Sequence, residues 1–249
     1  MMKLEKLMEV KSDAEGVFLE RVTRFTGLVS VGCERFQAHI HNTGRLPILS
    51  NGRRVLLKFE GGNNRKTSWD ILSVKHEDEW VFVHSGYHRR LAEIFLKRFF
   101  PDSPIFAEKV FGRSRLDFVV GENICVEVKG CTYKNGDIAM FPDAPTTRGT
   151  KHVEELTKCV KNGMRGFLLF LVFLKSSCFL PNDSIDPDFT RAFWQALKDG
   201  VEMKAVRIKY DGVFLYFSGE LPLCQKQKTP EERSNDSANQ VGNPRDLIR

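Results

Sequence analysis

Asp117, Glu127 and Lys129 are the residues of this chain whose types and spacing best suit chemistry. Paired carboxylates supply the hard oxygen ligands that Mg²⁺ and Mn²⁺ prefer. A metal held in this way polarises a phosphodiester and lowers the pKa of a bound water. A nearby lysine orients that water or stabilises charge on the phosphorus. We therefore predict that Asp117 and Glu127 bind Mg²⁺ or Mn²⁺ and that all three residues are catalytic.

The element that must position these residues is a β-hairpin over residues 114–130, SRLDFVVGENICVEVKG. Its two apolar runs flank the turn at 121–123, which pairs Val120 with Ile124. Continuing this antiparallel register places the two carboxylates opposite each other, with Cβ atoms about 5 Å apart. The lysine points to the same face, because it follows the glutamate by two residues. A surface hairpin that carries an ion pair has the same pattern, so spacing alone leaves both interpretations open.

A basic helix is predicted over residues 147–161, after a segment rich in turn formers. Thr146 or Thr147 can cap its first turn. The amino end of a helix that bears Arg and Lys is suited to binding phosphate, although a solvated polar face has the same composition. The candidate nucleic-acid-binding residues on this helix share one face and are Arg148, Lys151 and His152.

Residues 17–83 contain about five or six short β-runs separated by turn signals such as Asn51-Gly52. This pattern predicts a small closed barrel of the OB type. Basic and aromatic residues are interleaved along it, and such grooves hold single-stranded nucleic acid through phosphate contacts and base stacking. The candidate binding residues in this half are Arg45, Arg53, Arg54, Arg65, Lys66 and Trp69.

The aromatic residues of the barrel also suit its core, and we expect Phe25 to be buried there. His39 and His41 share one strand face, because they are two residues apart. Together they could bind a metal, but no third ligand is evident near them in the sequence.

The second half of the chain alternates helices and strands. A helical period begins after His84, with apolar residues at Leu91, Ile94, Phe95 and Phe99. A helix over 147–161, a fully buried strand over 167–174 and a helix over 186–198 follow. The order predicts an α/β (α+β) fold with a mixed sheet flanked by helices. We assign residues 1–84 to the barrel, 85–224 to the mixed-sheet domain, and the polar residues 225–249 to a disordered tail.

Composition bounds the partners and the compartment. The formal net charge is +6, which suits a polyanionic partner. The six cysteines form no C-x-x-C pair, so we expect reduced thiols in a cytoplasmic protein. The longest apolar run, residues 167–174, is far shorter than the roughly 20 residues that span a bilayer. Because no signal peptide is evident either, we expect a soluble protein with no membrane partner.

Several long motifs in these segments resemble the sugar fermentation stimulation protein A (SfsA) family. The matching stretches are HNTGRL at 41–46, RKTSWD at 65–70, FGRSRLDF at 111–118, VEVKGCT at 126–132 and MFPDAPTTRGTKHVEEL at 140–156. The resemblance covers about residues 15–223 and implies an N-terminal OB-like domain and a C-terminal PD-(D/E)XK nuclease-like domain. It also implies DNA binding of low sequence specificity and a link to sugar metabolism.

Carried over residue by residue, the resemblance places Asp117, Glu127 and Lys129 in the nuclease signature. It adds Asn42 and Arg115 to the candidate nucleic-acid-binding residues, beside those found from charge and spacing. The chain departs from the family pattern at residues 84–85, His-Ser where Asn-Thr is usual. Glu93 is the nearby helical carboxylate that could complete a nuclease site, but it lies among basic residues.

Three functional interpretations remain open at this point. The protein cleaves DNA with a metal ion, binds DNA as a regulatory factor without cleaving it, or processes RNA. The intact Asp-Glu-x-Lys set favours cleavage, whereas the description of the family favours regulation. Sequence decides neither whether the DNA is single- or double-stranded nor which oligomeric state the protein adopts.

Overall fold

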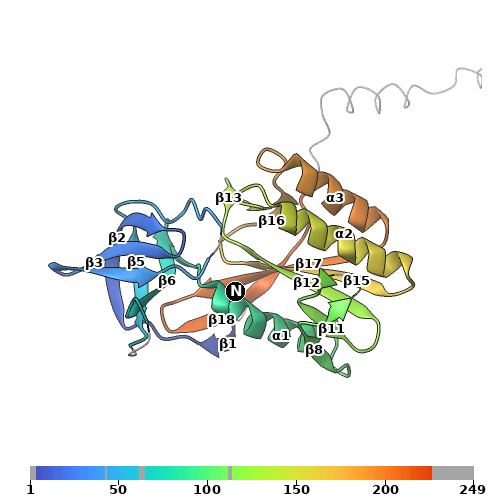
Figure 1. The fold of residues 1–249 in the computed structure, drawn as a ribbon, viewed down its shortest axis with the longest axis horizontal. Helices are drawn as coiled ribbons and strands as arrows, with labels where there is room; N and C mark the ends of the chain where they lie inside the picture. Colours follow the sequence, from blue (N-terminus) through green and yellow to red (C-terminus); the bar gives the residue numbers. More distant parts are fainter. Residues whose placement is uncertain (1–3, 43, 62–64, 112–113, 226–249) are drawn as a thin grey trace, which may run out of the picture.

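The computed structural model describes residues 4–42, 44–61, 65–111 and 114–225 of the chain. The predicted tail lies outside the described residues, except for Gln225. Figure 1 shows a β-barrel at one end of the molecule and a larger sheet with helices at the other.

The barrel is a closed five-stranded structure in which the strands follow the order β4-β3-β2-β5-β6. A parallel pairing of β4 with β6, through Ala38 and Trp69, closes it. Its strands are β2 (Ala14–Thr23), β3 (Thr26–Val31), β4 (Glu34–His39), β5 (Arg54–Phe59) and β6 (Trp69–His76). Alternate residues of these strands, such as Phe18, Val29 and Leu57, fill the interior.

The larger sheet is continuous with the barrel. β7 (Glu79–Phe82) pairs with β6 and, through Trp80 and Tyr210, with β17 (Glu202–Tyr210). From β17 the order continues β15-β12-β11-β8, with β12, β15 and β17 parallel. The bounds of the others are β15 (Arg165–Val172), β12 (Ile124–Cys131), β11 (Phe118–Val120) and β8 (Ile105–Ala107).

Shorter strands complete the structure. β1 (Glu5–Glu9) pairs with β18 (Phe214–Leu221), which in turn pairs with β17, so the first strand of the chain joins the C-terminal sheet. Two small sheets stand apart from the main one. Their strands are β9 (Val110–Phe111) with β10 (Ser114–Arg115), and β13 (Lys134–Asn135), β14 (Ile138–Phe141) and β16 (Cys178–Pro181).

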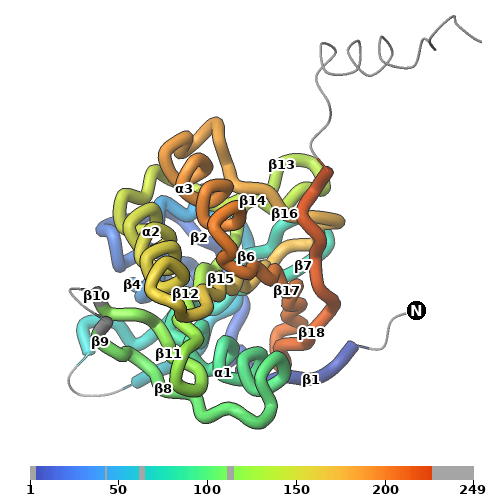
Figure 2. The backbone as a smooth tube through the Cα atoms, turned by 90° about the vertical axis from the view of Figure 1, so that its right-hand side faces the viewer, coloured from blue at the N-terminus to red at the C-terminus, as the bar shows by residue number. Residues whose placement is uncertain are grey.

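Helices cover both faces of the C-terminal sheet (Figures 1 and 2). The 3₁₀ turn η1 (Ser85–Tyr87) leads into α1 (His88–Phe99) on one face, while α2 (Thr147–Lys161) and α3 (Pro187–Lys198) lie side by side on the other. The middle strand β15 is buried on both faces, because Leu169 and Leu171 pack in the core of α1, and Leu168 and Phe170 in the core of α2 and α3.

The fold class predicted from sequence is confirmed. An OB-type barrel is joined to a nuclease-like mixed sheet flanked by helices. The predicted helix over 147–161 has the predicted bounds, and Asp186 caps α3 by accepting a hydrogen bond from the Phe189 amide at 2.9 Å. Among the described residues, no helix is both long and apolar enough to cross a membrane.

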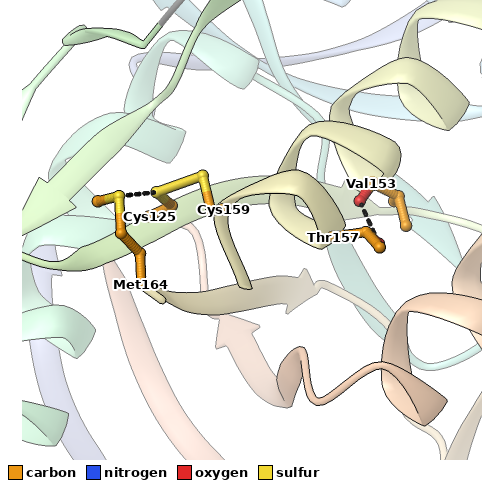
Figure 3. The surroundings of a disulfide bond; sticks show 5 residues. All are labelled: Cys125, Val153, Thr157, Cys159 and Met164. Carbon is orange, nitrogen blue, oxygen red and sulfur yellow. Dashed lines mark hydrogen bonds between the residues drawn. A yellow bond between two sulfur atoms is a disulfide. The ribbon is translucent and has the colours of Figure 1, made fainter. Parts of the chain in front are cut away.

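The expectation of reduced thiols is wrong for four of the six cysteines. Disulfides join Cys125 of β12 to Cys159 of α2 (Figure 3) and Cys178 of β16 to Cys224. The partners are 34 and 46 residues apart in sequence, so the absence of a C-x-x-C motif did not reveal them. Figure 3 shows Met164 beside the first pair, with its sulfur 4.0 Å from that of Cys125.

This pairing predicts a simple labelling pattern. In the unfolded, unreduced protein we expect iodoacetamide to alkylate two cysteines, Cys33 and Cys131, and after reduction all six. In the folded protein Cys33 reacts first, because it is exposed, whereas Cys131 is buried and burial raises its thiol pKa to about 12. Intact mass spectrometry counts the labels, and six labels without reductant would contradict the pairing.

Candidate active site

Of the hairpin predicted over 114–130, β11 and β12 form with the predicted register, whereas residues 114–115 pair with β9 instead. β11 and β12 are antiparallel and pair Val120 with Ile124 and Phe118 with Val126. Asp117 directly precedes β11, and its carboxylate accepts a hydrogen bond from the Val128 amide at 2.8 Å. This bond fixes the Asp117 carboxylate against β12, beside the glutamate and lysine of that strand.

Glu127 lies at the centre of the site and is almost fully buried, with 1% of its surface exposed. Its Oε2 atom is 3.0 Å from the Lys129 ammonium and 2.5 Å from Nδ1 of His152. The lysine and histidine also approach each other, at 3.2 Å. The buried carboxylate is therefore held between two nitrogen groups, one from its own strand and one from α2.

The two carboxylates have opposite pKa shifts. Burial raises the pKa of Glu127, but the hydrogen bond with His152 and the charge of Lys129 outweigh burial and bring it below its usual value. Burial and the adjacent Glu127 raise the pKa of Asp117. A buried and a half-buried carboxylate whose repulsion is only partly offset suit a divalent cation, and their oxygens are the ligands that Mg²⁺ and Mn²⁺ prefer.

α2 supplies the second wall of the site. Thr146 caps this helix by accepting a hydrogen bond from the Gly149 amide at 3.0 Å. Arg148 is exposed and lies within reach of His152, with 3.3 Å between its Nε and the imidazole Nε2. Lys151 is also exposed but does not line the cavity described next.

A cavity of about 440 Å³ opens in front of these residues. Its lining includes Asp117, Lys129, Arg148, His152, Ser85 and His88. A second cavity of about 610 Å³ lies next to it and shares Ser85, His88, Thr146 and Arg148. Together they form a cleft that runs from Asp117 to Asn42, Gly44 and Arg45 in a loop of the barrel.

The barrel loop forms the far wall of this cleft. Asn42 and Arg45 line it, and the Asn42 side chain accepts a hydrogen bond from the Gly44 amide at 2.9 Å. The Leu46 amide donates to the Asp143 carboxylate at 3.1 Å, which ties the barrel to the loop before α2. Arg21 also contacts this loop and donates a hydrogen bond to the Arg45 carbonyl at 2.6 Å.

The remaining predicted binding residues lie elsewhere. Arg54 pairs with Glu15 on β2, and Arg53 lines a separate cavity. Lys66 is exposed but lines neither cavity of the cleft, and Trp69 packs against Phe36. Two further arginines are held by carboxylates, namely Arg65 by Asp70 and Arg115 by Glu108. The cleft therefore brings together Asn42, Arg45, Arg148 and His152 of the predicted set.

The expectation that Phe25 is buried in the barrel core is wrong. Its side chain is 44% exposed, and its ring stacks beside that of His39 with centroids 6.3 Å apart. The residue lies in the tight turn between β2 and β3, where the chain reverses before the alternation of buried residues resumes. An exposed aromatic ring at this position is available for base stacking.

Sequence reasoning missed several residues of the cleft. Ser85, His88 and Arg89 reach it from η1 and the first turn of α1, and Glu108 reaches it from beyond β8. Arg89 lies near Glu108, with 3.7 Å between nitrogen and oxygen. Glu93 pairs instead with Arg89 and is not among the residues that line the cavity. The helix predicted after His84 was the sequence feature that could have indicated these residues, because its first turn lies near the end of β12.

His88 makes the stability of the protein sensitive to pH. Its ring stacks on Phe173, and burial lowers its pKa to about 4, against an ordinary value of about 6.5. As the pH falls, His88 therefore takes up its proton at a higher pH in the unfolded chain than in the folded protein. We expect the free energy of unfolding to fall by about 2 kcal/mol from pH 7 to pH 5. In urea unfolding, we expect His88→Gln to lose about that much of the pH dependence. An unchanged dependence would show that other groups cause it.

A closed OB-type barrel joined to a nuclease-like α/β domain defines the class of this protein. Family profiles agree: the "SfsA N-terminal OB domain" matches residues 19–83, and the "Sugar fermentation stimulation protein RE domain" matches residues 87–213. The chain belongs to the SfsA family.

Relatives from bacteria and archaea support this membership. The chain is 57% identical to a sugar fermentation stimulation protein homolog of Thermotoga neapolitana, over 88% of this chain and 99% of the relative. It is 38% identical to a homolog from Methanococcoides burtonii, over 91% and 98%. Among solved structures, Pyrococcus furiosus SfsA in complex with Ca²⁺ matches with a TM-score of 0.81 and 31% identity, over 88% of this chain and 99% of that chain.

Proposed function

We propose that this protein binds nucleic acid in the cleft between the barrel and the C-terminal sheet and hydrolyses its phosphodiester bonds with a divalent metal ion. The observation that carries the proposal is the convergence of four side chains: Asp117, Lys129 and His152 line that cleft, and the buried Glu127 lies behind them, in contact with Lys129 and His152. Three of these residues lie on the regular elements β12 and α2 rather than on loops, which suits a preorganised catalytic site.

Asp117 and Glu127 would hold Mg²⁺ or Mn²⁺, which when bound polarises the phosphodiester and acidifies a water molecule. Lys129 keeps its ammonium beside the carboxylates, where it stabilises negative charge that develops on the phosphate. His152 fixes the orientation of Glu127 through their contact at 2.5 Å. The exposed guanidinium of Arg148 contacts a neighbouring phosphate and positions the strand.

Two findings support the metal and the nucleic acid. The P. furiosus relative was solved with Ca²⁺, a divalent cation that prefers oxygen ligands as Mg²⁺ does. The family profile over residues 19–83 is that of an OB domain, a fold that binds oligonucleotides, and the net charge of +6 suits a polyanion. We propose DNA as the substrate and RNA as the alternative. Competition between DNA and RNA for the protein distinguishes the two.

The test is cleavage of a mixed panel of labelled single- and double-stranded DNA and RNA. The purified protein is assayed with Mg²⁺, with Mn²⁺ and with EDTA. Cleavage that depends on the metal supports the proposal. If no substrate is cut while DNA is still bound, regulation by DNA binding replaces it, in keeping with the link to sugar fermentation in the names of the relatives.

Two arginines should govern binding. We expect Arg45→Ala and Arg148→Ala each to weaken DNA affinity and to reduce the slope of log K against log salt by about 1, because each neutralises a phosphate across the cleft. Arg54→Ala is the matched control, since that side chain already pairs with Glu15 outside the cleft. Fluorescence anisotropy between about 50 and 200 mM salt measures both quantities. If all three changes had equal effects on affinity and on the salt slope, the cleft would not be the binding site.

A further inference from the structure

A second cluster of metal-ligating groups lies in the barrel. His41 follows β4, Asp70 is the second residue of β6, and His84 follows β7. The parallel pairing of β4 with β6 places residue 39 opposite Asp70 and carries the chain on to His41. Three strand ends thus meet, which sequence spacing alone does not show.

The ligand atoms of these residues converge. Oδ2 of Asp70 is 3.1 Å from Nε2 of His41 and 3.6 Å from Nε2 of His84. All three lie within 4.8 Å of one another, and over the part of the chain that the structure describes this is the one such group of three. The two imidazole rings stack with their centroids 3.9 Å apart, so both nitrogens face the same carboxylate oxygen.

The surroundings orient the Asp70 carboxylate and leave room for the histidine rings. Arg65 contacts Oδ1 of Asp70, which leaves Oδ2 directed at the histidines. The Ser85 amide donates to the His41 carbonyl at 2.8 Å and fixes the backbone on that side. A Cβ atom at Gly86 would stand 2.8 Å from the ring of His84, so this glycine leaves the room that the imidazole occupies. The contact of Arg65 with Asp70 is of the outer kind that orients metal ligands, whereas Nδ1 of His84 is buried without a hydrogen-bond partner among the described residues.

We propose that His41, Asp70 and His84 form a binding site for a divalent transition-metal ion of the zinc class. Two imidazole nitrogens and one carboxylate oxygen suit Zn²⁺ rather than Mg²⁺, which prefers oxygen ligands. Asp70 and His84 are buried, whereas the side chain of His41 is 31% exposed. The bound ion therefore keeps a coordination position open on the side of His41.

The site is separate from the candidate active site. None of its three ligands lines the cavity in front of Asp117, although Ser85, next to His84, lines both parts of the cleft. A metal at this point fixes the end of β7 against β4 and β6, and so holds the entry to η1 and α1.

Metal titration tests the proposal independently of any cleavage. Metal-free protein in a Cys33→Ser background, which removes the exposed thiol, is titrated with Zn²⁺ by calorimetry and with Co²⁺ by visible absorption. We expect one zinc equivalent that persists in Glu127→Gln and in the histidine control His76→Asn. The affinity for this zinc ion should fall about 100-fold or more in His84→Asn and in His41→Asn. Mutating a residue that only orients a ligand lowers metal affinity by up to about 100-fold, and losing the ligand itself has at least this effect.

Three outcomes would overturn the proposal. They are the absence of zinc binding in the parent protein, zinc binding that His84→Asn and His41→Asn leave unchanged, and zinc binding that Glu127→Gln abolishes. Circular dichroism checks that each variant is folded. If His84→Asn does not fold, His41→Asn decides, because its side chain is the more exposed of the two.

Discussion

Glu127→Gln is expected to lower metal-dependent cleavage by about 100-fold or more. The change removes the charge of the carboxylate that Lys129 and His152 contact, while it keeps the size of the side chain. Loss of one preorganised charged group at a reacting phosphate has an effect of this size. Initial cleavage rates of identically purified proteins, measured with Mg²⁺ and with Mn²⁺, provide the comparison.

Glu122→Gln is the matched control, because Glu122 is exposed in the turn of the same hairpin. This variant should cleave like the parent protein, and both variants should bind DNA through Arg45 and Arg148. Equal cleavage by the parent protein and Glu127→Gln would show that the activity comes from a contaminant. Circular dichroism is needed as well, since Glu127 is buried and its substitution must leave the fold intact.

Asp70→Asn is expected to reduce the free energy of unfolding by about 3 kcal/mol, measured in EDTA so that no metal contributes. The Asp70 side chain is 5% exposed and contacts His41, His84 and Arg65. Removing one partner of a buried charged network leaves the others uncompensated, and losses of about 3–5 kcal/mol result. Asp78→Asn, in the exposed turn after the same strand, should change stability by less than about 0.5 kcal/mol.

The pH dependence of this difference identifies its cause. Burial raises the pKa of Asp70, but hydrogen bonds with His41, His84 and Arg65 outweigh burial and hold it far below its usual value. A carboxylate with a lowered pKa contributes its full stability above the ordinary value of about 4 and loses it as the pH falls further. Urea unfolding should show that the gap between Asp70→Asn and the parent protein narrows as the pH falls below about 4. A gap that does not narrow would assign the loss to packing.

Local pattern was sufficient for the elements themselves. The alternation around the turn at 121–123 predicted the pairing of Val120 with Ile124, because turn length and side-chain period fix the register of a hairpin. The capping residues predicted where α2 and α3 begin, because Thr146 and Asp186 satisfy amide groups within three residues of themselves. The apolar run at 167–174 predicted a strand covered on both faces, since it offers no polar side to water.

Only the tertiary structure decided which of these elements meet. His152 reaches Glu127 because α2 packs on the face of β12 that carries the carboxylate, 25 residues away in sequence. The barrel loop closes the cleft through Leu46 and Asp143, 97 residues apart. Phe25 is exposed in the turn between β2 and β3, although its residue type suits a core.

The sequence by itself therefore determined the barrel, the mixed sheet and the positions of Asp117, Glu127 and Lys129 on the hairpin. Each of these features follows from the pattern of neighbouring residues along the chain. The grouping of His41 with Asp70 and His84, the disulfide of Cys125 with Cys159 and the pairing of β1 with β18 depend on packing between distant segments. Such contacts follow from how apolar faces are buried together, and no local period of the sequence records them.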